Sequence, residues 1–166
     1  MITFYTLFVI ELRSRLVQVC GTTVSPNGQW MTQVARQLTD GMDGFAGGKT
    51  HLIIDRDTKY CEGFRQILEA AGITIVLCAP RVPQCNAIAE RFVRSIKTEC
   101  LSRLLFLGEQ HLRSAVSSFV EHYNGFRNHQ GLQNKLLTPQ FLPVEGAIRC
   151  QKRLGGLLKY YYRKAA

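Results

Sequence analysis

The sequence predicts an α/β fold in which short apolar strands alternate with amphipathic helices. Residues 4–12 and 15–24 are two β-rich runs joined by a short polar turn, which is typical of a hairpin. Later apolar runs at 52–54 and 73–80 are also of strand length. Between and after them lie segments whose apolar residues recur with helical spacing, at 25–41, 61–72, 86–103 and 110–126.

Two of the predicted helices have a start or stop signal. The segment 25–41 opens with a capping Ser25 and a Pro26, and its apolar residues follow one helix face. The segment 61–72 ends at Gly72, a common helix stop. Between the strand at 73–80 and the next helix, two prolines predict an extended loop, "PRVPQC".

The helix predicted from Asn86 divides into two faces. Glu90, Arg94 and Lys97 share one face at i, i+4 and i+7, with Asn86 beside them. This face has two interpretations: a solvated surface with one Glu–Arg pair worth ~0.3–0.5 kcal/mol, or a carboxylate and cations that bind a metal ion and a phosphate chain. The opposite, apolar face comprises Ala89, Phe92, Val93, Ile96 and Cys100.

A second carboxylate of interest, Asp55, directly follows the strand at 52–54, in "HLIIDRDTKY". Asp is favoured in turns, but side chains at the carboxyl ends of strands in α/β sheets often line a site. Mg²⁺ binds a few carboxylate oxygens, and metal-dependent phosphoryl transfer needs carboxylates from separate elements. Asp55 at a strand end and Glu90 at a helix start satisfy that requirement.

The composition indicates a polyanionic partner. The 166 residues carry a formal net charge of +9, with 21 Lys and Arg against 12 Asp and Glu, which favours nucleic acid. The apolar N-terminal run is too short to span a bilayer and has no signal-peptide features. The six cysteines have no zinc-site spacing and are expected to be reduced thiols in a cytosolic protein.

The stretches "DRDTKY", "NAIAERFVRSIKTE" and "YNGFRNHQGLQNKLLTP" together resemble the integrase core of bacterial insertion-sequence transposases, which is related to retroviral integrases. The resemblance implies a ribonuclease-H-like mixed sheet flanked by helices, in a family of polynucleotidyl transferases that bind Mg²⁺ or Mn²⁺ with an Asp, Asp, Glu triad. Asp55 then corresponds to the second triad Asp and Glu90 to the Glu, as catalytic and metal-binding residues. Asp57 is a neighbour. The residues implied to contact DNA are Asn86, Arg91, Arg94 and Lys97.

The resemblance also implies function and setting: DNA integration and transposition in the bacterial cytoplasm, DNA as partner, and a homo-oligomer in the full-length family. The first triad Asp has no counterpart, because "LFVIEL" resembles the family's second strand and Glu11 a non-catalytic position. We therefore expect a partial core at 1–145, without the first central strand and inactive, and a basic tail at 146–166. Two alternatives stay open: Glu11 substitutes as a ligand, or the chain is a catalytically dead nucleic-acid-binding or protein-interaction remnant.

Two groups of residues have open roles at this stage. His129 belongs to the third family-like stretch, but a surface histidine is equally consistent with the sequence. Tyr160, Tyr161 and Tyr162 lie in the basic tail, where they either stack on bases or pack the tail onto the core.

Overall fold

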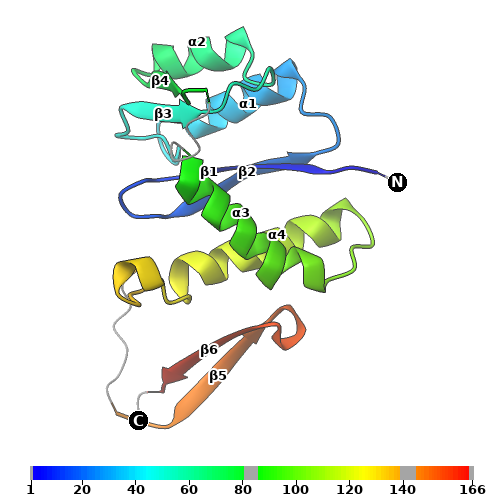
Figure 1. Cartoon of the computed structure of the whole chain (residues 1–166), viewed down its shortest axis with the longest axis vertical. Helices are drawn as coiled ribbons and strands as arrows, with labels where there is room; N and C mark the ends of the chain where they lie inside the picture. Colours follow the sequence, from blue (N-terminus) through cyan, green and yellow to red (C-terminus); the bar gives the residue numbers. More distant parts are fainter. Residues whose placement is uncertain (1, 81–85, 139–144, 165–166) are drawn as a thin grey trace. The chain divides into compact units, whose positions relative to one another are not determined.

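The computed structural model describes residues 2–80, 86–138 and 145–164 (Figure 1). The chain forms two compact units, one from Met1–Val9 with Gln18–Glu90 and the other from Ile10–Val17 with Arg91–Ala166. Most of the predicted proline-containing loop and the last residue of the third family-like stretch lie outside the described residues.

The predicted N-terminal hairpin is confirmed. Strands β1 (Tyr5–Ile10) and β2 (Val17–Thr23) form a two-stranded sheet. At the turn, the Glu11 backbone N–H donates to the Leu16 carbonyl at 2.9 Å. In this turn the Glu11 side chain accepts a 2.6 Å hydrogen bond from the Ser14 hydroxyl.

The core of the first unit lies between two helices, α1 (Gly28–Leu38) and α2 (Glu62–Ala70). The predicted cap of α1 is wrong by two residues: Asn27, and not Ser25, accepts a 2.9 Å bond from the Trp30 backbone N–H. The buried members of this core are Met31, Val34, Ala35, Leu38, Phe64, Leu68 and Ile73.

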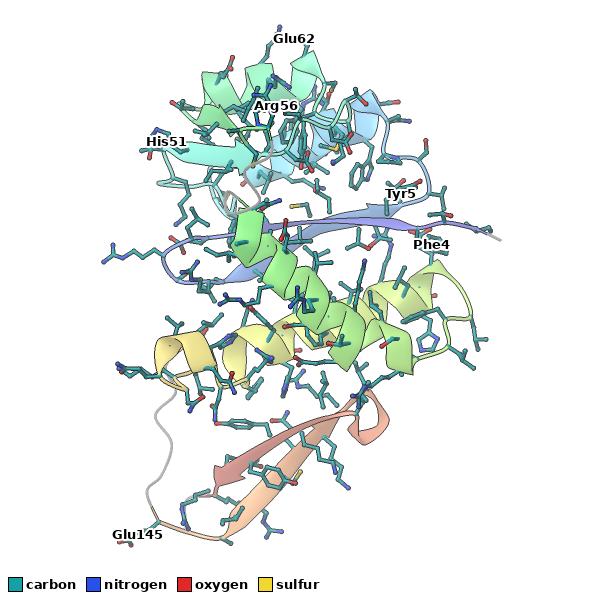
Figure 2. All side chains as sticks on the ribbon, in the orientation of Figure 1. Phe4, Tyr5, His51, Arg56, Glu62 and Glu145 are labelled. Atoms are coloured by element: carbon teal, nitrogen blue, oxygen red, sulfur yellow. The ribbon has the colours of Figure 1, made fainter. Side chains whose placement is uncertain are left out.

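Strands β3 (His51–Ile54) and β4 (Thr74–Leu77) form a parallel pair in which Ile54 lies opposite Leu77. Beyond the end of β3, the Arg56 guanidinium Nε donates to the Cys78 carbonyl at 3.0 Å. Figure 2 shows His51 at the start of β3 and Arg56 past its other end. The described residues form small two-stranded sheets in place of one continuous mixed sheet, because β3 and β4 pair only with each other and β1 with β2.

In the second unit, two helices pack through aromatic side chains. Helix α3 (Ala87–Glu99), followed by the short turn η2 (Leu101–Arg103), presents Phe92 to α4 (Glu109–Gly125). The Phe92 ring centroid lies 6.2 Å from that of Phe119 and 5.1 Å from that of Tyr123. Figure 1 shows the two helices as separate rods joined by a loop. The fold is therefore mixed α/β, as the sequence predicts, with helices and small sheets.

The basic tail is structured. After the turn η3 (Gln130–Leu132), the strands β5 (Ile148–Arg153) and β6 (Leu158–Arg163) pair antiparallel on either side of η4 (Leu154–Gly156). Leu158 is buried, and the Tyr160 ring contacts the Phe126 ring edge-on at 5.0 Å. For Tyr160, packing onto the core is therefore the role observed.

Candidate metal and nucleic-acid site

Asp55 lies immediately after β3, with its carboxylate half-exposed. Its Oδ1 accepts a 3.2 Å bond from the Asp57 backbone N–H, which closes a tight turn. The Lys59 ammonium is 3.5 Å from the same oxygen. Ile54 is buried and is the last residue of β3. Asp55 therefore lies at the carboxyl end of this strand, as the sequence predicts.

Asp57 holds the lysine of this loop. Its Oδ2 is 2.7 Å from the Lys59 ammonium, and its Oδ1 accepts the Lys59 backbone N–H at 2.9 Å. These bonds hold the pKa of the Asp57 carboxyl below its ordinary value, so Asp57 stays ionised and paired. Because the contact of Lys59 with Asp55 is 0.8 Å longer, Asp55 is the less engaged carboxylate. The unequal contacts of the two carboxylates with Lys59 are not visible in the sequence.

Glu90 lies in the first turn of α3, on the exposed face that the spacing predicts. Asn86, ahead of the helix, and Arg94 and Lys97 along it are exposed as well. The opposite stripe is buried at Phe92 and Ile96 on the helix and at Cys100 after it, and half-buried at Ala89 and Val93. Among the described residues Glu90 and Arg94 form no ion pair, so the sequence-based alternative of a Glu–Arg pair is not observed.

The predicted ligands do not belong to a complete metal cluster. Across residues 2–80, 86–138 and 145–164, no three or more His, Cys, Asp or Glu side chains gather closely enough to hold a metal ion. Asp55 and Glu90 both fall in the first unit, while Arg91, Arg94 and Lys97 fall in the second. The two carboxylates are two of the three that the resemblance implies, and their joint action stays a prediction.

The third family-like stretch has structural roles that sequence reasoning missed. The Asn124 amide clamps Val17 at the start of β2, since its Oδ1 accepts the Val17 N–H at 3.1 Å and its Nδ2 donates to the Val17 carbonyl at 2.8 Å. The side-chain amide thus satisfies the two backbone groups of one residue, 107 positions away in sequence.

Arg127 and His129 hold the chain after α4 against the ends of α3 and α4. The Arg127 guanidinium donates two bonds to the Glu99 carboxylate, at 2.6 and 3.1 Å, and so ties the end of α3 to the chain after α4. The His129 ring is buried and its Nε2 lies 2.9 Å from the Tyr123 carbonyl oxygen. His129 is not a surface histidine, and this stretch maintains the scaffold that carries Glu90.

His122 on α4 should make the second unit acid-sensitive. Its ring is buried, and its Nδ1 has no hydrogen-bond partner among the described residues. Burial lowers the pKa of this histidine, the charges of Arg153 and Arg127 lower it further, and the charge of Glu99 raises it. As the pH falls, the unfolded chain binds a proton at this histidine before the folded chain does. The contribution of His122 to stability is therefore fully present above its ordinary pKa near 6.5 and is lost as the pH decreases below that value.

We expect urea denaturation to show a loss of up to about 1 kcal/mol between pH 7.5 and pH 5.5 from this histidine. The substitution His122→Phe should reduce that pH dependence, and the remainder should come from His129, whose pKa is also lowered by burial. The matched control is His51→Gln, at an exposed position of the first unit. An unchanged pH slope in His122→Phe would show that another group carries the effect.

Comparison with known proteins finds a family that is similar to part of this chain. Residues 71–139 match the integrase core domain family. The matched residues include Glu90, the exposed cations of α3 and the whole third family-like stretch at 123–139, while Asp55 precedes them. No curated protein matched the sequence significantly.

Solved structures extend the likeness of the fold beyond residues 71–139. The catalytic core domain of BIV integrase is similar with a TM-score of 0.56 and 17% identity, over 77% of this chain and 86% of that one. A chain of the simian T-cell lymphotropic virus intasome, solved in complex with PP2A regulatory subunit B56 gamma, is similar with a TM-score of 0.59 and 13% identity. That likeness covers 97% of this chain and 66% of that chain. In the described part of the chain, no helix is long and apolar enough to cross a membrane.

Proposed function

We propose that the chain is the catalytic core of a transposase or integrase, which performs metal-dependent DNA strand transfer when its carboxylate set is complete. The observation that carries the proposal is the match of residues 71–139 to the integrase core domain family, with Glu90 on an exposed, cation-bearing helix face. Asp55, at the end of β3, supplies the second carboxylate by resemblance. The proposal includes a bacterial cytoplasmic setting and self-association, both from that resemblance.

The donor chemistry fits a hard divalent cation. Asp55 and Glu90 would hold Mg²⁺ or Mn²⁺, which prefer carboxylate oxygens. Such an ion supplies positive charge at the phosphodiester during transfer. Asp57 would keep Lys59 occupied and so leave Asp55 accessible. A third carboxylate is needed, and Glu11 is a poor candidate because it belongs to the hairpin turn and accepts the Ser14 hydroxyl.

The protein's own contribution to DNA binding would come from α3. Arg91, Arg94 and Lys97 are exposed, with Asn86 just before the helix. In the part of the chain that the structure describes, Arg94 and Lys97 take part in no ion pair, so both charges are available to phosphates. Phosphate contacts position a protein on DNA without reading its sequence. Binding should therefore be weak and independent of sequence.

A salt titration tests this interface. Affinity for duplex DNA should fall linearly with the logarithm of salt concentration, with a slope of about −0.9 per phosphate contacted. The substitution Arg94→Gln should reduce the magnitude of that slope by about 1. Arg36→Gln, at an exposed position on α1, should leave the slope unchanged. Affinity that does not respond to salt, or an equal change in both variants, would refute the α3 interface.

A second function is a DNA-binding or protein-interaction remnant without catalysis. The observation that favours it is the lack of a three-ligand cluster in the described ranges. Both proposed functions use the exposed face of α3 to bind DNA. A strand-transfer assay separates them, because only the catalytic core would show activity.

A further inference from the structure

The β5–β6 hairpin has two faces of opposite character. Because side chains alternate along a strand and paired residues share a face, the register assigns each residue to one side. The inner face packs toward α4, with Leu158 buried, Tyr160 against Phe126, and Arg153 paired with Glu121. The outer face consists of Ile148, Cys150, Lys152, Lys159, Tyr161 and Arg163, all exposed.

The outer face concentrates positive charge with no acidic residue to balance it. Lys152 lies directly opposite Lys159 in the register, an arrangement that costs stability in a hairpin because like charges face each other. Arg163 lies further along the same face, where its guanidinium donates to the Gly146 carbonyl at 3.0 Å. From 146 to 166 the sequence contains no Asp or Glu. A polyanion bound here would offset the repulsion.

An aromatic ring lies among these cations. Tyr161 is 61% exposed, whereas Tyr160 and Tyr162 are half-buried and stack on each other at 6.1 Å. Tyr161 pairs with Cys150, and its neighbours along β6 on the same face are Lys159 and Arg163. An exposed ring between cations spaced along a strand is the arrangement that binds unpaired bases and the backbone on either side of them.

We propose that the outer face of the β5–β6 hairpin binds single-stranded nucleic acid, with Tyr161 stacking on a base and Lys152, Lys159 and Arg163 contacting the flanking phosphates. This surface deepens the proposed function, since strand transfer exposes unpaired ends, and it rests on that function for its biological role. Its partner is an unpaired strand, whereas α3 is proposed to contact duplex.

The test measures binding of the full chain to two labelled probes of about 15 nucleotides, a single-stranded oligothymidine and a mixed-sequence duplex. Tyr161→Ala should weaken binding to the single strand about tenfold, because loss of one stacked base has an effect of that size. Tyr161→Phe keeps the ring and should keep the affinity. Neither variant should change duplex affinity, whereas Arg94→Gln should weaken the duplex complex.

The outcomes separate this inference from the proposed function. An unchanged single-strand affinity in Tyr161→Ala, or an equal loss in Tyr161→Ala and Tyr161→Phe, would overturn the stacking surface. Equal weakening of both probes by Tyr161→Ala would show a general electrostatic or folding effect, and would overturn it as well. If Arg94→Gln leaves duplex binding unchanged while Tyr161→Ala behaves as expected, the α3 interface fails and the hairpin surface stands.

Discussion

Strand transfer by the 166-residue chain should be undetectable with Mn²⁺, and should appear when a strand carrying an aspartate is added before β1. The described residues offer Asp55 and Glu90 but no cluster of three ligands, so a metal ion that neutralises transition-state charge would be poorly held. Loss of one catalytic electrostatic group costs several kcal/mol of barrier, or on the order of a thousandfold in rate. The assay joins a labelled DNA end to a target plasmid.

Four variants control this assay. In the extended chain, Asp55→Asn and Glu90→Gln should each remove activity, whereas Asp43→Asn, at an exposed loop position, should retain it. In the chain as given, Glu11→Gln should change nothing. Clear activity of the unextended chain that disappears with Glu11→Gln would contradict our assignment of Glu11 to the hairpin turn.

Phe119→Ala should destabilise the second unit by about 3–5 kcal/mol, the cost of removing a fully buried aromatic side chain. Phe119 is 0% exposed and its ring lies beside those of Phe92 on α3 and Tyr123 on α4. The measurement is urea denaturation followed by far-UV circular dichroism. Because Phe119 supports the helix that carries Glu90, the variant should also bind duplex DNA less well under conditions in which it begins to unfold.

The matched control is Leu107→Ala, in the loop before α4, where the side chain is 93% exposed. Its stability should stay within about 0.5 kcal/mol of the wild type. A loss below about 1 kcal/mol in Phe119→Ala would mean that the α3–α4 contact does not carry the stability of this unit.

Local features could be predicted from the sequence because each depends on neighbouring residues. The helical spacing of Phe92, Ile96 and Cys100 is enough to assign the buried stripe of α3, and therefore the exposed face of Glu90. Two β-rich runs joined by a short polar turn predict the hairpin. The cap of α1 shows the limit of such reasoning, since Ser25 and Asn27 are both good caps and only the backbone geometry selects Asn27.

Features that depend on distant residues could not be predicted. The clamp between Asn124 and Val17 joins positions 107 apart, and the bond from Arg127 to Glu99 needs the crossing geometry of two helices. The division of the strands into small sheets depends on which edges meet, a property of the whole fold. The types and positions of the candidate site residues could be proposed from the sequence. The shorter contact of Lys59 with Asp57 than with Asp55 could not, because it depends on the conformation of the loop.

The most direct test of a shared metal site is Mn²⁺ titration of the ¹⁵N-labelled chain followed by NMR, since the ion broadens amide signals near it. The amides of Asp55 and Glu90 should broaden at the same Mn²⁺ concentrations. Asp55→Asn should remove the broadening at Glu90 as well as at position 55, while Asp43→Asn, which removes an equal charge from an exposed loop, should leave both intact. Broadening at Glu90 that persists unchanged in Asp55→Asn would show that the two carboxylates do not hold one ion.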